Sequence, residues 1–133
     1  MKLLLIDENP FSSHDAQLLA NELGIYSIHL FDNVAQAWQT IGQRHLSFDV
    51  ALVRQADDPF SDLQQLDTLH RKLHAEHLLL KGAYSSQECQ ALLRAARTRK
   101  LPLLGILDVP LKRQQMLGAL RQIPGFPRFA TRD

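Results

Sequence analysis

Five short apolar runs recur along this chain of 133 residues, and each is followed by a stretch whose apolar residues return at helical spacing. Short, wholly apolar runs are typical of strands that are buried on both faces of a sheet. Strands that alternate with helices predict a parallel sheet with right-handed crossovers. The expected strands are residues 3–6, 25–31, 49–53, 77–80 and 103–107. The pattern therefore predicts an α/β domain.

Helix-starting and helix-ending residues lie at the borders of the stretches between these runs. Pro10 suits the first turn of a helix over residues 11–23, and Gly24 suits its end. Asn33 and Ser85 carry side chains that cap helix N-termini. The other expected helices begin after Asn33, Pro59 and Ser85, and the fifth covers residues 111–123.

The domain is expected to span residues 1–123, because the segment that follows breaks the pattern. Pro124, Gly125 and Pro127 disfavour both helix and strand. Residues 124–133 are therefore interpreted as a C-terminal tail or as the start of a linker.

Composition agrees with a single domain that has its own hydrophobic core. The chain has a mass of 15.1 kDa and is 45% hydrophobic and 22% charged. The single cysteine, Cys89, excludes an intramolecular disulfide. No apolar run reaches the ~20 residues that cross a bilayer, and Asp7 follows the first run too soon for a signal peptide. We therefore expect a cytoplasmic protein that is not bound to a membrane.

Charge divides the chain into an acidic and a basic part. Residues 1–80 hold 5 Lys and Arg against 11 Asp and Glu, whereas residues 81–133 hold 10 against 3. The overall charge of +1 thus conceals sums of −6 and +7. Part of this charge division is explained by attraction between the acidic and the basic part within one domain. The remaining positive charge predicts a basic face that meets an acidic partner.

Polar residues follow the expected strands. Asp7 and Glu8 come after the first strand, Arg54 after the third, Gly82 after the fourth, and Val109-Pro110 after the fifth. The carboxyl ends of parallel strands meet at one edge of a sheet, where ligand crevices form. An acidic pair at this edge suggests a site for a hard cation, because Mg²⁺ is often held by one or two carboxylates.

Across residues 2–123 the sequence resembles the receiver domain of two-component response regulators. The segment LLLIDENP at residues 3–10 is similar to the family's first strand, which ends in an acidic pair that binds Mg²⁺. The segment FDVALV at residues 48–53 is similar to the strand before the phosphate-accepting aspartate, and LLGILDVPL at residues 103–111 to the strand that ends in Lys-Pro. The resemblance implies a flavodoxin-like (βα)5 three-layer sandwich with a parallel sheet in the strand order 2-1-3-4-5.

Three positions depart from the family's pattern. Arg54 stands where the phosphorylated aspartate belongs, Val109 where the phosphate-binding lysine belongs, and Gly82 where a Thr or Ser hydroxyl belongs. A guanidinium has no lone pair with which to accept a phosphoryl group. The sequence therefore resembles a degenerate receiver, or pseudo-receiver, that is not phosphorylated.

The resemblance also predicts the geometry of the degenerate pocket. Arg54 is expected to pair with Asp7 or Glu8, and its forked guanidinium could reach both; the alternative is that it points to solvent. No cofactor is expected, and Mg²⁺ would bind only if the acidic pair were still active. Receivers hold the Lys-Pro peptide in cis, so the Val109–Pro110 bond is expected to be cis. The pocket residues are Asp7, Glu8, Arg54, Gly82, Val109 and Pro110.

Two aspartates close to Arg54 offer an alternative phosphate acceptor. Asp57 and Asp58 lie three and four residues beyond the acceptor position, which is expected to be too far along a loop to enter the same pocket. They are interpreted as turn or helix N-cap residues ahead of Pro59. A functional phosphoreceiver with a displaced acceptor is therefore the alternative function rather than the preferred one.

The resemblance implies a phosphorelay-type signalling or regulatory module that is not an enzyme and has no catalytic residues. A regulatory domain for a cyclic-di-GMP phosphodiesterase or for a transcriptional output is a further alternative. In receivers the face of the fourth helix, fifth strand and fifth helix serves dimers and partners, so a protein partner or a homodimer is expected there. Nucleic acid is not expected, because no reading helix or aromatic platform accompanies the charge. The candidate residues of this face are Arg94, Arg97, Lys112, Arg113 and Arg121.

Overall fold

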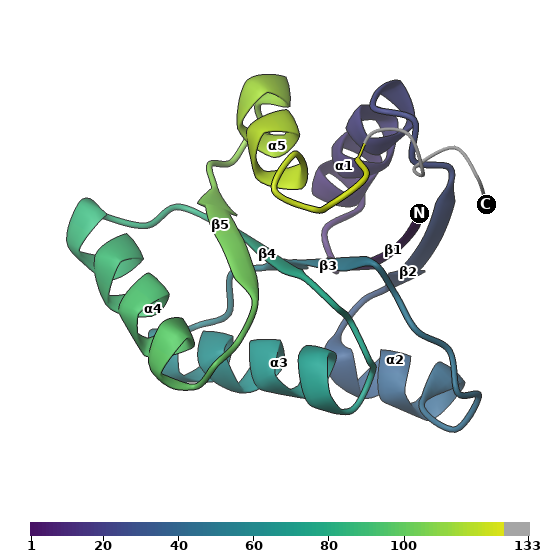
Figure 1. The fold of residues 1–133 in the computed structure, drawn as a ribbon, viewed down its shortest axis with the longest axis horizontal. Helices are drawn as coiled ribbons and strands as arrows, with labels where there is room; N and C mark the ends of the chain where they lie inside the picture. Colours follow the sequence, from purple (N-terminus) through teal and green to yellow (C-terminus); the bar gives the residue numbers. More distant parts are fainter. Residues whose placement is uncertain (127–133) are drawn as a thin grey trace.

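The structure is a computed structural model that describes residues 1–126, in which five strands alternate with five helices (Figure 1). The strands are β1 (Lys2–Ile6), β2 (Ser27–Phe31), β3 (Val50–Arg54), β4 (Leu78–Lys81) and β5 (Leu103–Leu107). The helices are α1 (Pro10–Glu22), α2 (Val34–Ile41), α3 (Pro59–Arg71), α4 (Ser86–Thr98) and α5 (Arg113–Leu120).

The strands form one parallel sheet in the order β2-β1-β3-β4-β5. Because β1 lies between β2 and β3, the strand order reverses direction at β1, and this is where a ligand crevice opens in such sheets. Figure 1 shows α1 and α5 on one side of the sheet and α2, α3 and α4 on the other. The predicted flavodoxin-like three-layer sandwich is confirmed.

Two hydrophobic cores fill the spaces between the sheet and its helices. Successive side chains of a strand point to opposite faces, so Leu4 and Ile6 join the core under α2, α3 and α4, whereas Leu3 and Leu5 join the core under α1 and α5. All four side chains are buried. The central strands are apolar throughout because both of their faces are covered.

Side-chain caps fix the helix starts that lie nearest the carboxyl edge of the sheet. Asn9 accepts hydrogen bonds from the backbone N–H groups of Phe11 and Ser12 at the start of α1. Asp58 accepts one from the backbone of Ser61 at the start of α3. The interpretation of Asp58 as an N-cap is thus confirmed, and both caps anchor loops that border the pocket described below.

The strand boundaries differ from the sequence prediction at the two positions that matter most for the pocket. β3 continues through Arg54, and β4 continues through Lys81, one residue beyond the expected end of each strand. Lys81 is fully buried, although a lysine would be expected to end a buried run. The structure therefore carries a cation into the interior that the sequence pattern did not predict.

The expected tail at residues 124–133 falls partly outside the described residues, which end at Phe126. Residues 124–126 follow α5, and Phe126 packs against the core under α1 and α5. Within residues 1–126, none of the helices combines the length and apolar character that crossing a membrane requires.

Candidate functional site: a pocket at the carboxyl edge of the sheet

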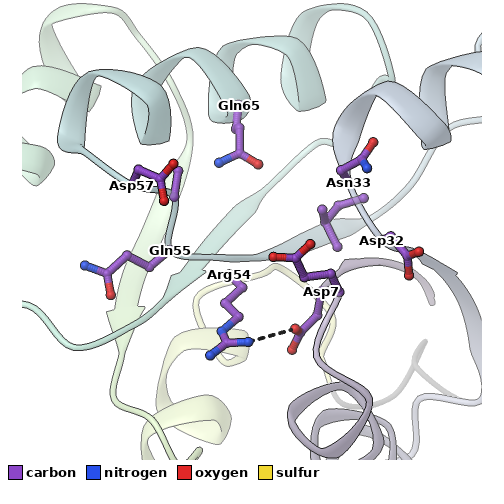
Figure 2. A pocket seen from close by; sticks show the side chains of 10 residues that line it. Asp7, Asp32, Asn33, Arg54, Gln55, Asp57 and Gln65 are labelled. Atoms are coloured by element: carbon purple, nitrogen blue, oxygen red, sulfur yellow. Dashed lines mark ion pairs between the residues drawn. The ribbon is translucent and has the colours of Figure 1, made fainter.

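A pocket of about 210 Å³ lies at the carboxyl edge of the sheet, beside the ends of β1 and β3 (Figure 2). Polar side chains from the connections after β1, β2 and β3 and from α3 surround it, so its position follows directly from the strand order. Of the six predicted pocket residues, Asp7, Glu8 and Arg54 line it, whereas Gly82, Val109 and Pro110 do not. The lining residues are Ile6, Asp7, Glu8, Asp32, Asn33, Arg54, Gln55, Ala56, Asp57 and Gln65.

The Asp7 carboxylate is held by two cations from neighbouring strands. Its Oδ2 lies 2.6 Å from Nζ of Lys81, and both side chains are fully buried. Its Oδ1 lies 3.6 Å from Nη1 of Arg54, whose side chain is 40% exposed (Figure 2). The predicted Arg54–Asp7 ion pair is confirmed, but Arg54 does not bridge to Glu8, which is exposed. Arg54 is therefore the outer and weaker partner of Asp7.

Lys81, which is buried behind Asp7 and does not itself line the pocket, is the partner of Asp7 that the sequence analysis missed. Its ammonium group also donates to the Ser12 hydroxyl at 3.0 Å and approaches the Ser12 carbonyl at 3.5 Å. It thus ties the end of β4 to the end of β1 and to the first turn of α1. The sequence did contain one indication of this role, because Lys81 directly follows the apolar run Leu78–Leu80. A lysine that continues a buried strand needs a carboxylate partner in the interior.

Burial and mutual contact shift the pKa values of both partners of this ion pair. Burial alone would raise the pKa of Asp7, but hydrogen bonds from Lys81, Ser12 and the backbone of Asn9 outweigh it and hold that pKa below its usual value. Burial lowers the pKa of Lys81, and Asp7 opposes this shift. Asp7 is therefore a carboxylate at neutral pH, and it is already neutralised by groups of this chain.

The residues present do not fit a resident Mg²⁺ ion. Asp7 accepts from the Asn9 backbone at 2.9 Å and faces Arg54 through Oδ1, while Oδ2 faces Lys81. A cation at Asp7 would have to displace a protein cation and would then sit beside the Arg54 charge. The other carboxylates that line the pocket are those of Glu8, Asp32 and Asp57, and within residues 1–126 they do not form with Asp7 a group that could hold a metal ion.

A side chain at the position of the family's hydroxyl, Gly82, would overlap its neighbours in this structure. A Cβ added to Gly82 would lie 2.5 Å from Cβ and 2.6 Å from Oε1 of Gln55, and 2.8 Å from Cε2 of Tyr84. Gln55 is held there because its Oε1 accepts the backbone N–H of Ala83 at 3.0 Å. Gln55 therefore occupies the space into which a Thr or Ser side chain would project.

A second buried carboxylate joins the two loops beside the pocket. Asp62 accepts the backbone N–H of Ala56 at 2.7 Å and the hydroxyl of Tyr84 at 2.8 Å. Burial raises the pKa of Asp62 above its usual value, and burial together with Asp62 raises the pKa of Tyr84. The β3–α3 loop and the β4–α4 loop are thus joined through side chains on the α3 side of the sheet.

The structure corrects one expectation about the two loop aspartates. Asp57 lines the pocket, and Figure 2 shows it there with Gln65 of α3. The expectation that Asp57 is too far along the loop to enter the pocket was therefore wrong, because the hydrogen bond from the Ala56 backbone N–H to Asp62 holds the start of the loop beside the pocket. Asp58 points to the start of α3, where its carboxylate accepts from the backbone and hydroxyl of Ser61.

The connection between β5 and α5, residues 108–112, contributes no cation to the pocket. The Val109–Pro110 peptide is cis, as predicted, and Val109 is 38% exposed. Lys112 pairs with Asp108 at 3.8 Å, and Arg113 reaches Glu22 of α1 at 4.0 Å. Lys81 of β4, rather than a residue after β5, therefore supplies the lysine that contacts Asp7.

Comparison with known proteins identifies the fold. No family model matches the sequence, and no curated protein sequence does. Solved structures match over nearly the whole chain. A signal receiver domain of a histidine kinase from Clostridium thermocellum has a TM-score of 0.72 and 12% identity, covering 94% of this chain and 98% of that one. The signal receiver domain of an HD domain-containing protein from Pseudomonas fluorescens has a TM-score of 0.65 and 22% identity, covering 92% and 85%.

A third match is a protein described as a pilus assembly protein (CpaE) from Burkholderia thailandensis. It has a TM-score of 0.66 and 23% identity, and the match covers 92% of this chain and 97% of that one. These likenesses show that the chain has the fold of a response-regulator receiver domain.

Proposed function

We propose that this chain is a receiver-like signalling module that acts through protein contacts without being phosphorylated. The observation that carries the proposal is the state of Asp7, which is closed off by Lys81 at 2.6 Å and Arg54 at 3.6 Å. Both cations come from this chain, so the Asp7 carboxylate is already neutralised. The module then presents one surface to its partners instead of switching between two.

The side chains around the pocket support this proposal on chemical grounds. Phosphoryl transfer to a carboxylate needs an in-line nucleophile and positive charge placed around the transferred group. Arg54 cannot serve as that nucleophile, and Gly82 has no room for a hydroxyl. The proposal therefore includes no catalytic activity of the module itself.

Incubation with acetyl phosphate and Mg²⁺, followed by intact-mass measurement, tests the proposal. We expect the mass to stay that of the unmodified chain, because no acceptor carboxylate stands at the end of β3. An active receiver treated in parallel should gain the mass of one phosphoryl group. Stoichiometric gain of that mass by the present chain would overturn the proposal.

A second candidate function is a phosphoreceiver with Asp57 as a displaced acceptor. The observation in its favour is that Asp57 lines the same pocket as Asp7, Glu8 and Arg54. The same mass measurement on Asp57→Asn and Asp58→Asn distinguishes it from the first proposal. A phosphoryl group that disappears in Asp57→Asn and persists in Asp58→Asn would establish this second function.

The output of the module is not fixed by the fold. The matched structures include the receiver domain of an HD domain-containing protein and a pilus assembly protein, so related folds occur with different outputs. Regulation of a cyclic-di-GMP phosphodiesterase or of a transcriptional output stays a prediction from the sequence.

A further inference from the structure

Strand β2 forms one edge of the sheet (Figure 1), and its outer side has no strand partner within residues 1–126. The Asp7 N–H donates to the Phe31 carbonyl at 3.0 Å, so the backbone of Phe31 faces β1. Backbone groups of successive strand residues point in alternate directions, so the N–H and C=O groups of Ile28 and Leu30 face outward. This edge therefore presents donors and acceptors to which a further strand can bind.

The sequence of β2 lacks the features that commonly keep an edge strand from pairing. These features are lysine, proline and β-bulges, whereas β2 reads SIHLF and pairs with β1 in unbroken register. The other edge of the sheet is less regular, because the register of β4 and β5 shifts beside Leu79. There Gln122 also donates to the Leu104 carbonyl at 3.0 Å. Of the two edges, β2 is therefore better suited to add a strand.

The surface around β2 is poor in charge and rich in exposed apolar groups. Residues 24–43, which include β2 and α2, contain Asp32 as their single Asp, Glu, Lys or Arg, although 22% of the whole chain is charged. Three large side chains of this segment are exposed: Tyr26 by 66%, Leu30 by 41% and Trp38 by 43%. Apolar surface without charge is typical of the central part of a protein interface.

We propose that β2 pairs antiparallel with β2 of a second copy of this chain, so that one sheet continues through a two-fold dimer. With Ile28 opposite Ile28 of the second copy, Tyr26 lies opposite Leu30 of that copy, and the same pair recurs across the two-fold axis. Ile28 and Leu30 align with β1 residues of the core under α1 and α5, so these side chains lie on one face of the joined sheet. Aromatic and aliphatic side chains that face each other across two strands stabilise their pairing.

The arrangement of charge favours a second copy at this edge. In the proposed register Asp32 lies opposite Gly24 of the second copy, because both are equally far from Ile28. The two Asp32 residues are then about 27 Å apart along the ladder, well beyond the Debye length of about 8 Å at physiological ionic strength. A dimer through α4 would instead bring the exposed Arg94 and Arg97 of both copies together, which is unfavourable. The inference goes beyond the proposed function and does not depend on it.

Amide hydrogen exchange over a concentration series tests the proposal on the unmodified chain. We expect the outward N–H groups of Ile28 and Leu30 to become protected by at least about tenfold as the dimer forms. The N–H of His29 faces β1 and should be protected at every concentration. Sedimentation should show a reversible equilibrium between monomer and dimer over the same range.

Paired charge substitutions test the register. Tyr26→Lys with Leu30→Lys places lysine opposite lysine twice in the dimer, and it should weaken dimerisation by at least about tenfold. Tyr26→Lys with Leu30→Glu places lysine opposite glutamate, and it should dimerise at least about tenfold more tightly than the double-lysine variant. Phe60→Lys is the matched control, because it replaces another exposed apolar side chain, at the start of α3. It should leave the affinity unchanged within about twofold.

The proposal is overturned if the chain stays monomeric up to about 1 mM. Protection of Ile28 and Leu30 that does not depend on concentration would also overturn it, because the edge would then be covered within one chain. A dimer that Arg97→Glu dissociates and the double-lysine variant does not would place the contact on another face. Equal affinities of the two paired variants would contradict the antiparallel register. Failure of the proposed function is separate, because it would appear as a gain of phosphoryl mass whether or not the dimer forms.

Discussion

Replacement of Lys81 by methionine is the most informative perturbation of the pocket. Methionine keeps a long side chain of similar shape, so the change removes chiefly the charge. Asp7 would then remain buried beside the Ser12 hydroxyl, the Asn9 backbone N–H and the partly exposed Arg54. Removing one partner of a buried ion pair typically costs about 3–5 kcal/mol of unfolding free energy. We expect a loss at the lower end, about 3 kcal/mol, because Arg54 compensates in part.

Equilibrium urea unfolding at neutral pH measures this loss, and a double-mutant cycle assigns it to the ion pair. Asp7→Asn alone should also be strongly destabilising, because it leaves Lys81 buried without a carboxylate. The double variant, Lys81→Met with Asp7→Asn, should be more stable than the sum of the two losses predicts by at least about 2 kcal/mol. Lys112→Met is the matched control, because its pair with Asp108 is exposed and should contribute less than about 1 kcal/mol.

A Lys81→Met variant as stable as the control would refute the reasoning, because it would mean that Lys81 does not neutralise Asp7. Additive losses in the cycle would refute it as well, because two buried partners at 2.6 Å cannot be energetically independent.

Three further predictions concern the groups around this pair. Arg54→Ala should cost only about 0.5–1 kcal/mol of unfolding free energy at low salt and less at high salt, because the guanidinium is partly exposed and lies 3.6 Å from Asp7; urea unfolding at two salt concentrations measures it. Gly82→Ala should lower the free energy of unfolding by about 1–3 kcal/mol, because the added Cβ overlaps neighbouring side chains. Gly118→Ala, in open space within α5, should raise it by about 0.5–1 kcal/mol. A gain in stability at both positions would contradict the packing described beside the pocket. Asp62→Asn should change the pH dependence: burial raises the pKa of Asp62, so the folded state binds that proton more tightly than the unfolded state. Wild-type stability relative to Asp62→Asn should then be greatest near pH 4 and fall as the pH rises through the folded pKa, which unfolding curves between about pH 4 and 7 would show.

The fold could be predicted from the sequence because its main determinants are local. The buried strands are apolar runs, and Asn33, Asp58 and Ser85 cap helices through hydrogen bonds within three residues. The strand order came from the resemblance to receivers, because periodicity does not determine which strands are neighbours. The confirmed order shows that a few motifs at strand ends were enough to identify the topology of this α/β sheet.

The pocket could be predicted only in part, because its decisive contacts join residues far apart in the chain. The Arg54–Asp7 pair followed from the charges at two strand ends. Lys81 was missed because a charged residue usually marks the end of a buried run, whereas here its ammonium group reaches a carboxylate inside. The position of Asp57 was missed because the path of the β3–α3 loop depends on the tertiary bonds of Asp62, which no local pattern indicates.

Amide NMR with Mg²⁺ and beryllofluoride, a mimic of the bound phosphoryl group, tests most directly whether the pocket is closed by its own cations. With Asp7 held by Lys81 and Arg54, we predict that the amides of Asp7, Glu8 and Arg54 keep their chemical shifts throughout the titration. An active receiver treated in the same way should show large changes at the corresponding strand ends. Saturable shifts that cluster at Asp7, Glu8 and Arg54 of the present chain would contradict the proposal.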